Sequence, residues 1–134
     1  MTSSFVTASA LAALALAIIA MPAAAQQAPR ALPQAMHGTW GYEAKSCTEE
    51  TDDGRANVAA RSVEFFASAC TFTRFSRSRD GTWTVRGTCA EEGEAGTTPG
   101  SVSLRLLADG RLSIGLDGAA AHAYQRCAQA MRVR

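Results

Sequence analysis

The segment VSLRLLADGRLSIGL, residues 102–116, decides the fold that we expect for this chain. Apolar and polar residues alternate on both sides of Asp109-Gly110, a dipeptide typical of tight turns. A three-residue loop at 108–110 places the apolar residues of both strands on one face, whereas a two-residue loop would divide them between two faces. The facing pairs are then Leu106 with Leu112, Leu104 with Ile114, and Val102 with Leu116. The segment therefore predicts a β-hairpin with one buried face.

Similar segments follow one another along the chain, separated by turns that contain Gly. We expect strands at 38–42, 57–66, 70–75, 82–89, 102–106, 112–116 and 123–127. No convincing amphipathic helix lies between them. The pattern predicts an all-β fold, a small antiparallel meander that closes into an up-and-down barrel of about seven or eight strands, because closure removes exposed strand edges. The inward side chains that we infer are Trp83, Val85, Leu104, Leu106, Leu112 and Ile114.

Length and charge restrict the classes of function. The chain has 134 residues, the size of one domain, and its recurring apolar segments exclude a disordered protein. Its 13 basic and 12 acidic side chains leave a net charge of +1. A nucleic-acid-binding domain usually carries a strongly basic face, so we expect no nucleic acid among the partners.

The N-terminal residues 1–29 contain no charged side chain, and their apolar stretch 5–21 ends at Pro22. The small residues 23–25 that follow are typical of a signal-peptidase site. We predict a signal peptide at 1–25, cleavage between Ala25 and Gln26, an extended lead-in at 26–36, and one disulfide-stapled barrel domain at 37–134. The alternative is a retained membrane anchor, because about 17 apolar residues is near the lower limit for spanning a bilayer. After cleavage no stable membrane span would remain.

Basic charge comes from twelve Arg and a single Lys, Lys45, a composition that indicates a GC-rich bacterial genome. Together with the predicted signal peptide, this composition predicts that the protein is located in the periplasm.

Four cysteines, Cys47, Cys70, Cys89 and Cys127, lie inside the predicted barrel domain. An even number of cysteines in a small exported domain is typical of two disulfides. A zinc site is disfavoured, because the sequence has no CxxC pair to hold an ion locally. Three pairings are formally possible, and we predict the one that joins Cys47 to Cys127 and Cys70 to Cys89.

The register of the hairpin at 70–89 bears on this pairing. A four-residue loop at 78–81 sets the two cysteines directly opposite each other. A three-residue loop instead matches Phe75 with Val85 and sends the cysteines to opposite faces. If the two cysteines are bonded, either the first register holds or a bulge lies between the two.

Two strand ends carry a resemblance to a known family. Gly38-Thr39-Trp40 opens the first strand as the GxW motif opens the first strand of lipocalin-like barrels, and Arg126 sits where that superfamily often has an Arg stacked over the motif Trp. In size and export the chain resembles the small periplasmic barrels that inhibit secreted metalloproteases, which also have a GxW-like start followed by a cysteine, here Cys47. The resemblance implies a structural pair of Trp40 and Arg126, with the guanidinium within about 6 Å of the ring.

The sequence indicates no catalytic residue, no metal ligand set and no cofactor. The two histidines, His37 and His122, lack the spacing of known metal or catalytic motifs. The acidic loops at 49–53 and 91–94 lack the EF-hand pattern and are typical of solvated loops. A nucleophile elbow, a P-loop and a dinucleotide fingerprint are absent from the sequence. We therefore expect that the protein is not an enzyme.

A candidate basic patch falls on the hairpin at 70–89. Its members are Arg74, Arg77, Arg79 and Arg86. Such a patch would suit an anionic partner such as lipopolysaccharide or an acidic protein, and the alternative is a solvated strand face.

These features together predict an exported, non-enzymatic binding or inhibitor-like protein of the bacterial periplasm. Its partner would be another periplasmic or secreted protein, and we expect a monomer. The alternative function is that of a small-ligand carrier of lipocalin type. The bulky side chains that we place inside the barrel leave little room for a lipid and favour action through the outer surface, the loops or the termini.

Overall fold

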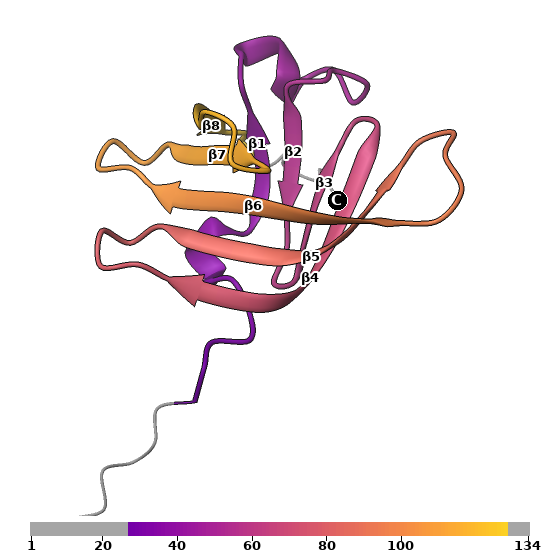
Figure 1. The fold of residues 1–134 in the computed structure, drawn as a ribbon. Coiled ribbons are helices and arrows are strands. Elements are labelled where there is room, and N and C mark those ends of the chain that lie inside the picture. The colour runs from indigo at the N-terminus through magenta and orange to yellow at the C-terminus, as the bar shows by residue number, and fades with distance from the viewer. Residues whose placement is uncertain (1–26, 129–134) are drawn as a thin grey trace, which may run out of the picture.

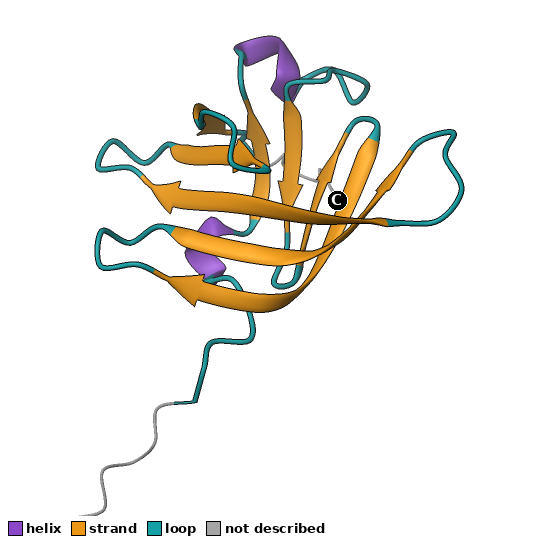
Figure 2. Cartoon of the chain, viewed as in Figure 1, coloured by secondary structure: helices purple, strands orange, loops and turns teal. Residues whose placement is uncertain are grey.

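The computed structural model describes residues 27–128, which form a closed barrel of eight antiparallel strands (Figures 1 and 2). Each strand pairs with the next along the chain, and β8 pairs with β1. The strands are β1 (Gly38–Gly41), β2 (Arg55–Val58), β3 (Ser62–Phe65), β4 (Ser68–Arg77), β5 (Trp83–Glu91), β6 (Thr98–Leu106), β7 (Leu112–Leu116) and β8 (His122–Arg126). Two 3₁₀ helices, η1 (Gln34–Met36) and η2 (Ala44–Cys47), precede and follow β1. The predicted all-β meander barrel is confirmed.

The segment 57–66, which we expected to be one strand, is a hairpin of β2 and β3. Val58 and Val63 are Cα partners across it, and the Ala59 N–H donates to the Ser62 carbonyl at 2.9 Å. The two valines are five residues apart, so a single strand would direct them to opposite faces. The turn between them brings both into the core, where both are buried.

The hairpin at 102–116 has the predicted register, including the Leu104–Ile114 pair. Its loop is the three-residue one, with the Leu107 N–H donating to the Arg111 carbonyl at 2.8 Å and Gly110 at φ +86°. The prediction was wrong for the two strand-terminal leucines. Leu106 and Leu116, each the last residue of its strand, are 38% and 42% exposed, although their partners Leu112 and Val102 are buried.

The β4–β5 hairpin combines both registers that the sequence allows. Cys70 pairs with Cys89 and Phe75 with Val85, because the register shifts between Phe72 and Arg74. This β-bulge lets two phenylalanines three residues apart, Phe72 and Phe75, both face the core. Gly87 lies opposite Phe72, and a Cβ there would sit only 1.9 Å from the Thr71 carbonyl oxygen, so the bulge requires glycine.

The segment before β1 belongs to the barrel, which corrects the expected domain boundary. We placed 26–36 outside the domain as an extended lead-in, yet Leu32 and Met36 are buried in the core and 34–36 is helical. The Leu32 N–H donates to the Ala60 carbonyl at 2.8 Å, and the Trp40 Nε1–H donates to the Met36 carbonyl at 2.9 Å. These contacts hold η1 against one end of the barrel.

Both predicted disulfides are present, joining Cys47 to Cys127 and Cys70 to Cys89. No helix in the described part of the chain is long and apolar enough to cross a membrane. The predicted signal peptide at 1–25, its cleavage point between Ala25 and Gln26, and the last residues of the predicted domain, 129–134, lie outside the described residues.

The strand order divides the connections between two ends of the barrel, because successive connections of an antiparallel meander alternate. The η2 end carries the connections 42–54, 66–67, 92–97 and 117–121. The η1 end carries 59–61, 78–82 and 107–111 together with η1 itself. In Figure 1 the β4–β5 and β6–β7 loops of the η1 end project to the left, whereas η2 lies at the top and the β5–β6 loop at the right.

Candidate binding site

Charge is segregated between the two ends of the barrel. The connections of the η2 end hold eight carboxylates and one amine, a formal net charge of −7: Glu43, Glu49, Glu50, Asp52, Asp53, Glu92, Glu94, Asp117 and Lys45. The connections of the η1 end hold Arg61, Arg79 and Arg111 against Asp80 and Asp109. A chain with a net charge of only +1 therefore presents one strongly acidic end.

A hollow of about 390 Å³ opens at the acidic end, between the 42–54 connection and the start of β8. Its lining includes Tyr42, Lys45, Asp52, Asp53, His122 and Tyr124, and we call it the Tyr42 hollow. It combines aromatic rings with charged groups in one concave surface, which is a common composition for binding sites in proteins.

Barrel closure brings the aromatic walls of the hollow together. Trp40 pairs with Arg126 and Gly41 with Gln125 across β1 and β8, so Tyr42, the next residue, lies beside Tyr124. The Tyr42 ring centroid is 5.6 Å from that of His122 and 5.8 Å from that of Tyr124, with interplanar angles of 82° and 60°. The rings thus form a corner instead of a parallel stack, and Tyr42 remains 51% exposed.

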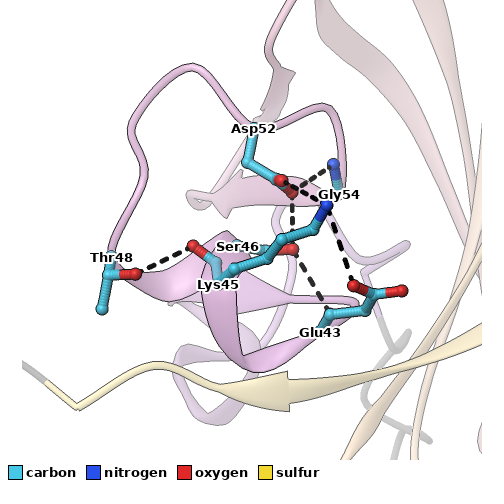
Figure 3. A network of polar contacts seen from close by, with 6 residues as sticks. All are labelled: Glu43, Lys45, Ser46, Thr48, Asp52 and Gly54. Carbon is cyan, nitrogen blue, oxygen red and sulfur yellow. Dashed lines mark hydrogen bonds and ion pairs between the residues drawn. The ribbon is translucent and has the colours of Figure 1, made fainter.

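Asp52 organises the polar side of the hollow (Figure 3). The residue is only 9% exposed, and its carboxylate accepts hydrogen bonds from the Ser46 hydroxyl at 2.6 Å and the Gly54 N–H at 2.9 Å. The Ser46 hydrogen bond above all lowers the pKa of Asp52, with the Gly54 N–H and the Lys45 charge acting in the same direction and desolvation opposing them. Asp52 is therefore held as a carboxylate that fixes the 42–54 connection.

Lys45 places an ammonium group between two carboxylates of the same connection (Figure 3). Its Nζ lies 3.6 Å from Asp52 Oδ2 and 3.9 Å from Glu43 Oε2. Ser46 accepts a hydrogen bond from the Glu43 N–H at 3.3 Å and so completes a capping box at the start of η2. The acidic surface thus already holds one cation, supplied by the chain itself.

The Cys47–Cys127 disulfide ties η2 to the residue after β8. A Cβ at Gly41 would sit 2.9 Å from Cys47 Sγ, so glycine at 41 is what allows η2 to pack closely over β1. The disulfide and this close contact hold the wall of the Tyr42 hollow against the strands that supply its aromatic rings. The site is preorganised, which lowers the ordering cost of binding.

Tyr124 is the half-buried wall of the hollow. Burial raises the pKa of its hydroxyl first of all, and the neighbouring Tyr42 and the Asp53 charge raise that pKa further. Tyr124 is therefore a neutral phenol at physiological pH, and the negative charge of Asp53 at the rim acts on its hydroxyl.

The predicted pair of Trp40 and Arg126 lies away from this hollow, toward the η1 end. The Arg126 Cζ is 4.1 Å from the centroid of the Trp40 ring, inside the distance that we expected. Its Nη1 donates to the His37 carbonyl at 2.8 Å and its Nη2 to the Ala35 carbonyl at 2.5 Å. The guanidinium thus links β8 to η1 and covers a Trp40 ring that is 0% exposed.

The four arginines of the candidate patch do not form one cluster. Arg74 and Arg86 are exposed Cα partners on β4 and β5. Arg77, opposite Trp83 at the end of β4, lines a separate hollow of about 420 Å³ at the η1 end. Arg79 lies in the β4–β5 loop. The structure therefore brings two of the four together.

The two histidines also lie apart, since His37 Nε2 is 3.0 Å from the Leu32 carbonyl oxygen and His122 borders the Tyr42 hollow. Within residues 27–128 no group of three or more potential metal ligands gathers.

Sequence reasoning missed the Tyr42 hollow, although a signal for it was present. Once Trp40 is paired with Arg126, the antiparallel register sets Tyr42 opposite Tyr124. Comparison of the chain with protein-family models, with curated proteins and with solved structures finds no match.

The Asp52 network predicts a pH-dependent stability. Because folding lowers the pKa of Asp52 from its unfolded value near ~3.9, its contribution is complete above that value and is lost as the pH falls through the folded pKa. We expect Asp52→Asn to be less stable than the wild type at neutral pH, with the difference shrinking below pH ~4. Asp53→Asn, at the exposed neighbour, is the control and should change stability little. Urea unfolding from pH 2 to 7 measures this, and a difference that stays constant over that range would contradict the network.

Proposed function

We propose that the chain is an exported, non-enzymatic binding protein of inhibitor type in the bacterial periplasm, which binds another protein through the acidic end of its barrel. One observation carries the proposal. A concave, aromatic-walled hollow lies among connections of net charge −7 and is held in place by a disulfide and a buried carboxylate. Such a fixed, charged surface suits recognition of a partner of opposite charge.

Packing inside the barrel supports a surface function over that of a lipocalin-type carrier. The inward side chains include Trp40, Phe72, Leu104 and Leu112, each no more than 1% exposed. A barrel of eight strands is either filled by side chains or holds one small ligand, and these buried bulky side chains favour the filled form. The binding groups are then those of the ends and the outer face.

The lipocalin-like start motivates the carrier alternative, and it is also compatible with inhibitor type, because the small periplasmic inhibitor barrels have a GxW-like start too. Gly38-Thr39-Trp40 and the stacked Arg126 match the motif of that superfamily, and the barrel is compatible with it. The resemblance in size to periplasmic barrels that inhibit metalloproteases is the reason for proposing inhibitor type. The predicted signal peptide at 1–25 and the two disulfides are what support an oxidising compartment outside the cytoplasm.

Partner capture tests the proposal. The oxidised protein, immobilised, is exposed to the periplasmic and secreted fractions of its own bacterium, and retained proteins are identified by mass spectrometry. One variant neutralises two charges at the acidic end, Glu50→Gln with Asp53→Asn, and a matched control neutralises two at the opposite end, Arg61→Gln with Arg79→Gln.

We expect a partner that the wild type and the control retain and the acidic-end variant loses. Retention of nothing by the wild type, or a partner lost only by the control, would overturn the proposal.

A further inference from the structure

The Tyr42 hollow has the aromatic walls of a cation site. The rings of His122 and Tyr124 stand at 82° and 60° to the ring of Tyr42, and their centroids lie within 5.8 Å of its centroid. A planar group that enters the corner between these rings therefore contacts more than one of them. A cation over the face of a tyrosine within ~6 Å of its centroid gains ring-quadrupole attraction. Tyr42, exposed at the rim, and Tyr124, half-buried behind it, are the rings that such a cation would contact.

The charges of the hollow have the matching sign. Glu43, Asp52 and Asp53 line it against Lys45 alone, and Lys45 lies near the first two. Among residues 27–128 Asp53 makes no ion pair, and it is exposed at the rim. One carboxylate beside two tyrosines is thus available to a cation from outside the chain.

We propose that the Tyr42 hollow receives an arginine side chain of a basic segment of the partner protein. The guanidinium would stack on the exposed Tyr42 ring, contact Tyr124 behind it and donate hydrogen bonds to Asp53. A guanidinium suits this arrangement better than a quaternary ammonium, because it stacks on aromatic rings and also donates to carboxylates. This inference rests on the proposed function, whose partner it describes.

The occupant is a segment of a protein and not a free small cation because the negative charge extends well beyond the hollow. Glu49, Glu50, Glu92, Glu94 and Asp117 lie in the connections of the same end and outside the lining of the hollow. A single small cation would leave them unmatched, whereas a segment with several positive charges is complementary to them. Binding should therefore weaken as salt is added.

NMR titration of the isotopically labelled, oxidised protein tests the inference. The probe is a capped hexapeptide of alternating Ala and Arg, and the matched control replaces each Arg by citrulline, its neutral isostere. Tyr42→Phe keeps the aromatic wall, Tyr42→Leu removes it at unchanged charge, and the amide spectrum of each variant reports that it is folded.

We expect amide shifts centred on Tyr42, Gly54, His122 and Tyr124, with the citrulline peptide at least about tenfold weaker. Tyr42→Leu should weaken the Arg peptide by about tenfold and Tyr42→Phe by less than about twofold. Unchanged binding by Tyr42→Leu would mean a diffuse acidic attraction and would overturn the inference. Tighter binding of tetramethylammonium than of the peptide, or binding of neither, would also overturn it.

Failure here is distinguishable from failure of the proposed function. A partner captured by the wild type, lost by the Glu50→Gln, Asp53→Asn variant and retained by Tyr42→Leu would leave the function standing and remove the arginine site.

Discussion

Replacing Trp40 by Ala should lower the free energy of unfolding by about 3–5 kcal/mol, the usual range for deleting a core aromatic side chain. The indole is 0% exposed, donates to the Met36 carbonyl at 2.9 Å and is covered by the Arg126 guanidinium. Its loss removes packing between β1, β8 and η1 together, since these are the elements that it joins. Urea unfolding followed by circular dichroism measures the change.

Trp83→Ala is the matched control for Trp40→Ala. Trp83 is only partly buried, near the η1 end of β5, so its loss should cost less than that of Trp40. Arg126→Ala should also cost less, because a partly solvated cation–π contact contributes about 1 kcal/mol. An unchanged stability of Trp40→Ala would contradict closure of the barrel through β1 and β8.

Removing the Cys47–Cys127 disulfide by double substitution to Ala should lower the free energy of unfolding by about 4.5 kcal/mol in the chain-entropy model. The bond joins residues 80 apart, so without it the unfolded chain gains much freedom. Guanidinium unfolding of the variant and the wild type under oxidising conditions measures the loss.

The second disulfide, Cys70–Cys89, gives an internal comparison. It spans only 19 residues, for which the same model gives about 3 kcal/mol. Only the Cys47–Cys127 disulfide fixes η2, so only the removal of that disulfide should weaken partner capture. Equal loss of capture on removal of either disulfide would contradict the role that we assign to η2.

The sequence predicts this fold well where alternation and turn residues agree. In 102–116 a single register places the internal leucines and Ile114 on one face, and that register is found. At 70–89 two registers each satisfied part of the pattern, and the structure uses both by inserting a bulge. A bulge inserts one extra residue into one strand, and no particular residue type marks its position. The alternation of apolar and polar residues alone therefore cannot locate it.

Two other differences have physical causes of the same kind. Val58 and Val63 are an odd number of residues apart, which indicates a turn between them if both face the core. We did not predict that turn because the segment contains no Gly or Pro. Leu32 and Met36 lie in a segment with prolines and no strand pattern, so only their burial in the barrel identifies them as core.

The candidate site was less predictable than the fold because it forms between distant parts of the chain. Tyr42 and Tyr124 meet only when β1 pairs with β8. The segregation of charge likewise depends on which connections share an end, and the expected basic patch of Arg74, Arg77, Arg79 and Arg86 divides between the outer face and the η1 end. Of the two acidic loops that we expected to be merely solvated, the one at 49–53 supplies Asp52 and Asp53 to the hollow, and the one at 91–94 leads into a connection of the same end of the barrel.

We propose that this barrel binds its partner through the acidic end. Hydrogen–deuterium exchange of the captured complex, compared with the free protein, shows which amides the partner covers. We expect new amide protection in the 42–54 connection and at 122–124 of β8, with the loops at 59–61, 78–82 and 107–111 unchanged. Protection confined to those three loops of the η1 end would contradict it.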